Sequence, residues 1–339
     1  MKAILYRGGR AELADIPVPE IGPDELLLAM EACGLCGTDL MKLGAKPERA
    51  VLGHELCGRL AKVGRDVRGW REGERVVAAH HVPCGDCHYC RRGNVSMCRQ
   101  FKATNVEPGG FCEYVKLSAL HARHSTLRVP DGLGTEAASQ TEPLACCLRN
   151  VKRLGARAGD AVGVVGLGAI GQLTARLLSH LGVRVLGLDL DAGRVKSLAR
   201  YGRGYLEADA FEEAARAAGQ GRGLDAVILS AGTPALAGRA VGWLRDGGSL
   251  NVFASFHPDP RLSLDLNQVY HRELSLISSY SPALEDLREA LELIASGRVD
   301  PLFADQRRYE LARFEEAVAD VRARRATKAI LLPREPASR

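Results

Sequence analysis

The stretch AVGVVGLGAIGQLTARLLSHLG, residues 161–182, contains the pattern that decides the fold. Its first seven residues form an apolar run typical of a buried strand, and the residues from Ala169 have the spacing of a helix that ends at a glycine. Between them, Gly166, Gly168 and Gly171 form G-x-G-x-x-G. In a dinucleotide-binding turn these glycines allow a tight turn, close approach of the backbone to a pyrophosphate, and close packing of helix on strand. A glycine-rich turn without a ligand has the same pattern, so the flanking strand and helix carry the interpretation.

An acidic residue follows at the spacing that this motif requires. Asp189 ends the next apolar run, VRVLGLDL, where a carboxylate would accept hydrogen bonds from an adenosine ribose. A 2′-phosphate there would meet like charge, at about 4 kcal/mol for unit charges about 4 Å apart in an effective dielectric near 20. Arg194 and Arg200 would soften this repulsion, so NAD is favoured over NADP. The expected cofactor-binding residues are Gly166, Gly168, Ala169, Ile170, Gly171, Asp189 and Arg194.

Outside this motif, the pattern of the chain indicates two kinds of domain. From about residue 160 to 280, six strand-like runs alternate with helical segments, which predicts a doubly wound parallel sheet. The first 140 residues consist of short β-rich pieces divided by Gly, Pro and charged turns, which predicts an irregular, mostly antiparallel β domain. Two helical and two strand-like segments after residue 284 are too small for a core of their own, so they should complete one of these units.

Length and charge narrow the class of protein further. A chain of 339 residues is too long for one typical core and favours two domains. The surplus of 46 Lys and Arg over 41 Asp and Glu is small, and no basic run of five or more residues accompanies it, which argues against nucleic-acid binding. The beginning, MKAILYRGG, indicates a first strand rather than a signal peptide, and no apolar run reaches the roughly 18 residues of a membrane span. We therefore expect a cytoplasmic protein with reduced thiols.

Four cysteines stand close together in CGDCHYCRRGNVSMC, residues 84–98. The spacing C-x₂-C-x₂-C-x₇-C suits a tetrahedral zinc with four thiolate ligands and no open position, which predicts a structural metal. An iron–sulfur cluster and a thiol redox centre are the competing interpretations. A zinc module for nucleic acid would need a larger basic and aromatic surface than Arg91, Arg92 and Arg99 offer. The expected ligands are Cys84, Cys87, Cys90 and Cys98.

A second group of metal-binding residue types lies upstream. CGLCGTD contains Cys33 and Cys36, and GHE contains His54 and Glu55. A site of one Cys, one His and one carboxylate leaves a position open for water or an alcohol. Far along the chain, TEPLACC adds Glu142 as a further candidate ligand or as a residue that contacts one. A lone His is more often paired with another buried group, and a lone Glu more often lies in solvent, than either binds a metal. The interpretation as a metal site therefore depends on the combination of Cys, His and carboxylate.

Taken in order, these motifs resemble the zinc-dependent medium-chain dehydrogenases, the alcohol dehydrogenase family. The quoted set runs CGLCGTD, GHE, CGDCHYC with a later Cys, GGFCEYV, EPLACC, GLGAIG and Asp189, and the resemblance covers nearly the whole chain. The Glu-Pro pair at 142–143 is similar to the sorbitol and threonine dehydrogenase branch. The resemblance implies a GroES-like catalytic domain in residues 1–145 and 285–339 and a Rossmann NAD-binding domain in residues 146–284. It also implies a homo-oligomer, either a tetramer or a dimer.

The resemblance assigns roles to the candidate ligands. Cys36 and His54 are implied to hold a catalytic zinc, and Glu55 and Glu142 both stay open as the third protein group. Cys33 matches a family cysteine that does not bind metal. With the four-cysteine site, the expectation is two zinc ions per chain. The remaining cysteines are expected to be small core residues: Cys57, Cys112, Cys146 and Cys147.

The implied reaction is hydride transfer between a secondary alcohol and NAD, with zinc lowering the pKa of the alcohol hydroxyl. Thr38 resembles the family hydroxyl that contacts the substrate oxygen and begins a proton relay, and Asp39 is expected to orient His54. Met41 stands where many relatives have a relay His, which counts against threonine dehydrogenase activity in particular. The proton would pass from Thr38 and the cofactor ribose directly to water, or through one of three other groups: His80, His81 or Glu142.

The expected substrate is a small alcohol or ketone, specifically a polyol, sugar or amino alcohol. The alternative is a zinc-containing binding or regulatory protein that has kept this fold without activity. Intact residues at the open metal site, including Cys36, His54, Glu55 and Thr38, argue against that alternative.

Overall fold

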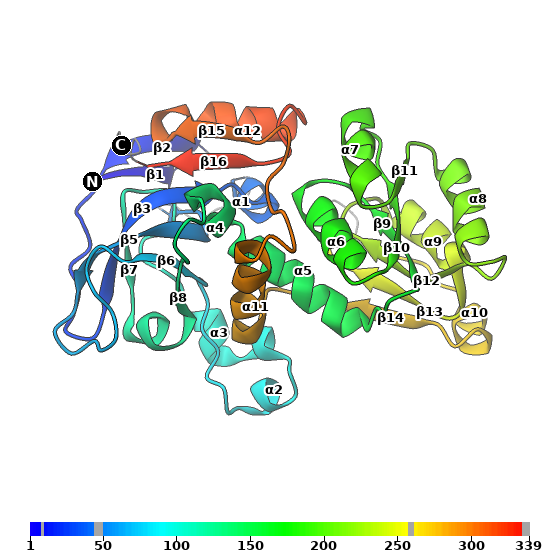
Figure 1. The fold of residues 1–339 in the computed structure, drawn as a ribbon, viewed down its shortest axis with the longest axis horizontal. Helices are drawn as coiled ribbons and strands as arrows, with labels where there is room; N and C mark the ends of the chain where they lie inside the picture. The colour runs from blue at the N-terminus through cyan, green and yellow to red at the C-terminus, as the bar shows by residue number, and fades with distance from the viewer. Residues whose placement is uncertain (8–9, 44–49, 257–260, 334–339) are drawn as a thin grey trace. The chain divides into compact units, whose positions relative to one another are not determined.

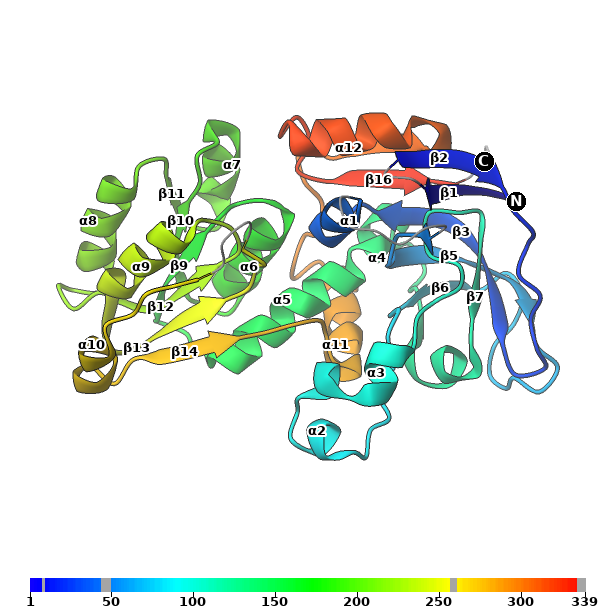
Figure 2. The same ribbon diagram turned by 180° about the vertical axis from the view of Figure 1, so that it is seen from behind.

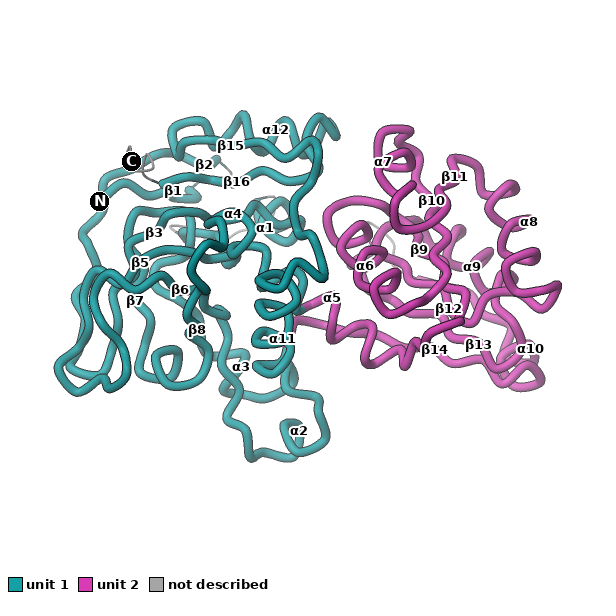
Figure 3. Tube along the Cα trace, viewed as in Figure 1, with its two compact units in different colours: residues 1–145, 283–339 teal, residues 146–282 magenta. Residues whose placement is uncertain are grey.

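The computed structural model describes residues 1–7, 10–43, 50–256 and 261–333. The chain forms two compact units, one of residues 1–145 and 283–339 and one of residues 146–282 (Figure 3). The expected junctions at 145/146 and 284/285 coincide with the first of these boundaries and lie two residues from the second. The second unit is thus inserted in the sequence of the first. No helix among the described residues has both the length and the apolar character needed to cross a membrane.

A parallel six-stranded sheet forms the centre of residues 146–282 (Figures 1 and 2). Its strand order is β11-β10-β9-β12-β13-β14, so the chain starts in the middle, moves to one edge and returns to build the other, as in a Rossmann fold. The predicted doubly wound sheet is confirmed. Every residue of β9 is buried, which explains its continuous apolar run. The strands are Ala161–Val165 (β9), Arg184–Leu188 (β10), Arg203–Tyr205 (β11), Leu224–Leu229 (β12), Leu244–Val252 (β13) and Ser275–Ser278 (β14).

Helices connect these strands. The rings of Phe211 on α8 and Trp243 on α9 meet in the core with centroids 4.8 Å apart. The segment PALAGRAVGWLRDG, residues 234–247, reads as one helix in the sequence, and this prediction is wrong at its end. The helix ends at Trp243, and Leu244 begins β13 by pairing with Leu224. The helices are Ala169–His180 (α6), Ala192–Ser197 (α7), Ala208–Ala218 (α8), Pro234–Trp243 (α9) and Leu266–His271 (α10), with a 3₁₀ turn Leu198–Arg200 (η3); Thr141–Leu154 (α5) begins in the first unit.

The first unit is built on two sheets, as the β-rich pattern predicts. A seven-stranded sheet has the order β15-β16-β3-β5-β6-β8, with β7 also paired to β3, and a small sheet has the order β2-β1-β4. Among the described strands of this first unit, only β15 and β16 pair in parallel. The strands are Lys2–Arg7 (β1), Arg10–Asp15 (β2), Leu26–Gly34 (β3), Ala50–Val51 (β4), Glu55–Val63 (β5), Arg75–Ala78 (β6), Tyr114–Leu117 (β7), Thr126–Arg128 (β8), Arg307–Glu310 (β15) and Ala329–Leu332 (β16).

The segment after residue 284 completes this unit, as expected. β16 pairs with β3, where Leu331 lies opposite Cys33, and Phe314 packs its ring 5.2 Å from that of Phe111 in the core. The helices and turns of the unit are Gly37–Lys42 (α1), His88–Arg91 (α2), Val95–Met97 (η1), Arg99–Ala103 (α3), His121–Ser125 (η2, a π-helical turn), Thr135–Ser139 (α4), Leu284–Ala295 (α11), Leu311–Arg313 (η4) and Phe314–Arg322 (α12).

Candidate functional site

The glycine motif lies at the turn between β9 and α6 and has the geometry that its glycines predict. Gly166 has φ +88°, a left-handed conformation that residues with side chains rarely adopt. A Cβ at Gly171 would lie 1.8 Å from the carbonyl oxygen of Gly166, so only glycine permits this packing of helix on strand. A Cβ at Gly168 would have only Arg194 nearby, at 3.8 Å, so the turn is open on that side. Ala169 and Ile170 begin α6 directly behind it.

Asp189 lies beside this turn at the carboxyl end of β10. Its Oδ2 accepts a hydrogen bond of 2.6 Å from the N–H of Leu167, and its Oδ1 accepts one of 2.9 Å from the N–H of Asp191. The nearest guanidinium nitrogen of Arg194 is 3.8 Å from Oδ2. The structure therefore brings the acid, the arginine and the glycines together on one unit. An open turn beside a fixed carboxylate fits a dinucleotide.

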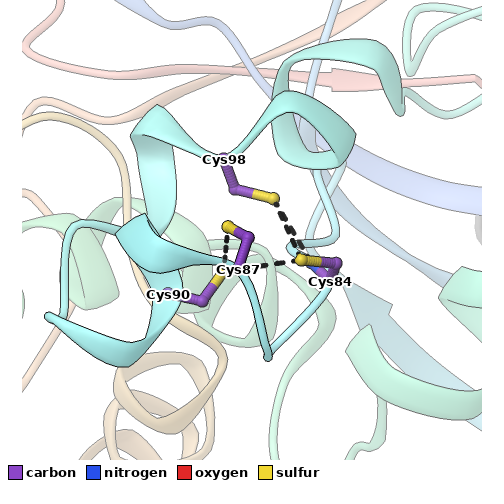
Figure 4. A group of neighbouring side chains, drawn as sticks. All are labelled: Cys84, Cys87, Cys90 and Cys98. Carbon is purple, nitrogen blue, oxygen red and sulfur yellow. Dashed lines mark hydrogen bonds between the residues drawn. The ribbon is translucent and has the colours of Figure 1, made fainter.

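The sulfur atoms of the four clustered cysteines converge (Figure 4). The measured Sγ–Sγ distances are 3.6 Å for Cys84–Cys98, 3.6 Å for Cys87–Cys90 and 4.0 Å for Cys84–Cys90. A tetrahedral zinc with Zn–S bonds of about 2.3 Å requires sulfur separations of about 3.8 Å. Burial alone raises the pKa of Cys98, but the N–H groups of Cys84 and Phe101 and the neighbouring thiols lower it to about 6. Burial and the neighbouring thiols raise the pKa of Cys90 to about 12, so it is the convergence of the four sulfur atoms that suits the loop to a metal.

Cys36, His54 and Glu55 form a second group, with ligand atoms that all lie within 4.8 Å of one another. Strand pairing explains why they meet. In the antiparallel pair of β3 and β5, Gly34 lies opposite Glu55, so Cys36 just after β3 comes close to His54 just before β5. A soft thiolate, an imidazole and a carboxylate are a donor set that fits zinc with an open coordination position.

Asp39 fixes the orientation of this group. Its Oδ1 lies 3.4 Å from Nδ1 of His54, and its Oδ2 accepts a hydrogen bond of 3.0 Å from the N–H of Cys36. Burial raises the pKa of the Asp39 carboxyl, but His54 and the N–H groups of Cys36 and Gly53 lower it below its usual value. A charged Asp39 holds the His54 ring with Nε2 directed away from it.

Lys328 is a residue of this site to which the sequence reasoning gave no role. Its Nζ lies 2.6 Å from Oε1 and 2.5 Å from Oε2 of Glu55, and both side chains are almost fully buried. A Cβ at Gly34 would lie 1.7 Å from Oε2 of Glu55, so the pair fits only against a glycine. Burial lowers the pKa of Lys328, but Glu55, Cys36 and Glu142 raise it above its usual value. The only sequence signal was a lysine in the strand-like KAILLP.

The two candidates for the third ligand therefore lie differently. Glu55 belongs to the three-residue group but is already paired with Lys328. Glu142 is buried in the first turn of α5 and acts electrostatically on the same lysine, but it lies outside the three-residue group.

The residue expected to begin the proton relay lies on α1, as does Met41. Thr38 is half-buried, two residues after Cys36, and Met41 is 42% exposed.

A row of rings extends from the three-residue group. The ring centroids of His54 and His80 are 4.8 Å apart, those of His80 and His81 are 4.1 Å apart, and those of His81 and Phe101 are 4.7 Å apart. Nδ1 of His81 hydrogen-bonds with the carbonyl of Thr104. Burial, together with His54, lowers the pKa of His80 well below its usual value. The row connects the group of Cys36, His54 and Glu55 with α3, which directly follows Cys98.

Comparison with known proteins agrees with this geometry. The family model of the alcohol dehydrogenase GroES-like domain matches residues 22–131, and that of the zinc-binding dehydrogenases matches residues 169–296. The chain is 27% identical to a sorbitol dehydrogenase of Bacillus subtilis over 93% of this chain and 92% of that protein. It is 31% identical to a D-altritol 5-dehydrogenase of Agrobacterium fabrum over 80% of this chain and 82% of that protein.

Solved structures give the same result. A zinc-binding dehydrogenase of Sinorhizobium meliloti bound to NADP superimposes with a TM-score of 0.88 and 28% identity, over 98% of this chain and 99% of that one. The first family model covers the residues of both metal-binding groups, and the second begins at Ala169, within the glycine motif. We conclude that the chain belongs to the family of zinc-binding, medium-chain alcohol dehydrogenases and is an oxidoreductase.

Proposed function

We propose that this protein is a zinc-dependent dehydrogenase that oxidises a secondary alcohol, namely a polyol, sugar or amino alcohol, with NAD. The observation that carries the proposal is that the ligand atoms of Cys36, His54 and Glu55 converge. Together they suit a zinc ion that keeps one coordination position open for the substrate. A zinc ion there would act as a Lewis acid on the alcohol oxygen, and a nicotinamide would accept the hydride. The sorbitol and altritol dehydrogenases among its relatives support a polyol.

Individual residues would take separate roles in this reaction. Cys36 and His54 would hold the metal, with Glu55 or Glu142 as the third protein group, and Asp39 would orient His54. The hydroxyl of Thr38 would accept the proton of the alcohol and pass it on towards water. The four-cysteine loop would hold a second, structural zinc, because four thiolates leave no position for a substrate.

NAD is the proposed cofactor because Asp189 occupies the position beside the glycine turn. Its carboxylate, oriented by two backbone N–H groups, would accept hydrogen bonds from the adenosine ribose and repel a 2′-phosphate. Arg194 lies close enough to reduce this repulsion, so NADP should be used less well rather than excluded. The NADP seen in the Sinorhizobium meliloti structure is a property of that protein.

We also infer that the protein forms a cytoplasmic homo-oligomer, a dimer or tetramer. The support is a set of exposed apolar side chains on and near β14, the outermost strand of the six-stranded sheet among the described residues, and on α10. Leu276 and Tyr280 are 60% and 62% exposed, and Leu266 and Tyr270 on α10 are 76% and 77% exposed. Such a surface on an unpaired strand edge is typical of an association site. Light scattering coupled to gel filtration would measure the assembly, and a monomer would contradict it.

The proposed activity can be tested by two measurements on the same preparation. Metal analysis should give two zinc ions per chain, and a screen of secondary alcohols, polyols and amino alcohols should reveal reduction of NAD. One zinc ion per chain and no turnover with any alcohol would instead favour a binding protein that retains only the structural metal. Comparable kcat/KM values for NAD and NADP would contradict the cofactor assignment.

A further inference from the structure

His80 lies beside the group of Cys36, His54 and Glu55. The reaction proposed above gives no role to its ring nitrogens. Its ring lies next to that of His54, with centroids 4.8 Å apart. The ring is half-buried, and its enclosed nitrogen, Nδ1, has no hydrogen-bond partner among the described residues. Nε2 is not among the buried atoms that lack a partner, and it makes no hydrogen bond within the described residues, so it keeps some exposure to solvent.

The protein holds this ring firmly without using its nitrogens. The carbonyl of His80 accepts a hydrogen bond of 3.0 Å from Nε2 of His121, and Nδ1 of His121 lies 2.8 Å from Oγ of Ser118. The rings of His54 and His81 both pack against the His80 ring, with centroids 4.8 and 4.1 Å away. A side chain that is fixed on its backbone and packed against two rings is preorganised for binding.

The neighbouring imidazole of His81 differs in one respect. Its Nδ1 hydrogen-bonds with the carbonyl of Thr104, which fixes the position of its proton. Because Nδ1 of His80 has no such partner, Nε2 of His80 is free to donate or to accept. A hydroxyl group, which both donates and accepts, is the ligand that suits such a nitrogen.

We propose that Nε2 of His80 binds the hydroxyl next to the one that is oxidised, so that the enzyme selects vicinal diols and polyols over simple secondary alcohols. This inference rests on the proposed function, since it places the reacting oxygen at the group of Cys36, His54 and Glu55. The carbon next to the reacting one would then come close to the His80 ring, whose centroid lies 4.8 Å from that of His54. His80 contributes specificity, and Thr38 retains the contact with the reacting oxygen.

The test compares two substrates that differ by one vicinal hydroxyl, propane-1,2-diol and propan-2-ol. In His80→Phe, which keeps an aromatic ring but no nitrogen, the ratio of kcat/KM for the diol to that for the simple alcohol should fall about tenfold or more. The kcat/KM for propan-2-ol should fall much less than that for the diol, because the simple alcohol has no second hydroxyl for His80 to bind. His80→Gln, which keeps a donor and an acceptor, should recover part of the ratio.

His81→Phe is the matched control, because it removes the adjacent imidazole whose Nδ1 is already used by Thr104. Its substrate ratio should stay within about threefold of the unmodified value. Zinc content and melting temperature of each variant verify that it is folded. An unchanged ratio in His80→Phe overturns the proposal. Equal losses for both substrates also overturn it, because they indicate a proton-relay role instead.

A binding measurement separates this inference from the proposed function. On zinc-loaded protein with NAD, propane-1,2-diol should raise the melting temperature more than propan-2-ol does, and His80→Phe should abolish this difference. If no alcohol is oxidised but the difference is present and depends on His80, the proposed activity fails and the binding role of His80 stands. If the difference is absent from the unmodified protein, the inference is wrong.

Discussion

Replacement of Lys328 by methionine should destabilise the first unit more than any other single change in the candidate site. Methionine keeps an unbranched apolar chain but removes the ammonium that lies 2.5 and 2.6 Å from the two oxygens of Glu55. Both side chains are buried, with 3% and 1% of their surface exposed. The Glu55 carboxylate would therefore stay buried without a positive charge to compensate it. Breaking a buried ion pair in this way costs about 3–5 kcal/mol.

Removal of the other partner of this ion pair, by Glu55→Gln, should cost less stability. Lys328 would still have Cys36 and Glu142 nearby, the two other groups that raise its pKa. We expect a loss of about 1–3 kcal/mol, typical of a buried group that loses a charged partner. The double variant Lys328→Met/Glu55→Gln contains neither buried charge, so its cost should fall short of the sum of the single costs by about 2 kcal/mol or more.

Thermal unfolding of the zinc-loaded and the chelator-treated protein would measure these costs. For a unit of this size, about 1 kcal/mol corresponds to roughly 2–4 °C, so Lys328→Met should lower the melting temperature by about 6–20 °C. The pKa of Lys328 is raised in the folded protein, so its contribution is present below the usual lysine pKa of about 10.4 and is lost only above it. The effect should therefore be constant from about pH 6 to 9. Additive single and double effects would refute the reasoning.

Four other changes give separate outcomes. Cys90→Ser should lower the zinc content to one ion per chain and reduce the melting temperature with little change in KM, and full thermal stability would count against a metal there. Asp189→Ser should raise the ratio of kcat/KM for NADP to that for NAD. Thr38→Ala should lower kcat by about 100-fold or more, and an unchanged single-turnover rate would exclude its relay role. In Asp320, hydrogen bonds from Tyr309 and Arg325 hold the pKa at about 2, so its contribution is present above about pH 4 and is lost as the pH falls to about 2. Asp320→Asn should remove that part of the acid dependence of the melting temperature.

The sequence predicts those features of this protein that depend on neighbouring residues. The three central strands β9, β10 and β12 are short, mainly apolar runs between helices, so their order along the chain is enough to indicate the fold. The four clustered cysteines fall within one loop, where spacing alone brings their sulfur atoms together. The boundary at Trp243 could not be predicted, because the residues after it continue the helical pattern and only their pairing with Leu224 makes them a strand.

The features that sequence reasoning missed depend on distant pairing. Glu55 and Lys328 meet because β3 pairs with β5 on one side and with β16 on the other, and no local pattern contains that register. The position of His80 beside His54 likewise follows from the pairing of β5 with β6. Composition indicates which residue types can do chemistry, but the sheet register decides which of them meet.

The 273-residue separation between Glu55 and Lys328 also has a consequence for the order of folding. During synthesis, β3 and β5 leave the ribosome long before β16, and the whole of residues 146–282 is made in between. That inserted unit can fold first, since domains generally fold as units. Until β16 arrives, the nascent first unit has an open edge on β3 and a carboxylate without its cation. The late segment thus covers the edge of β3 with β16 and brings Lys328 to the carboxylate of Glu55 in one step. This segment should set the slow, topology-limited phase of folding.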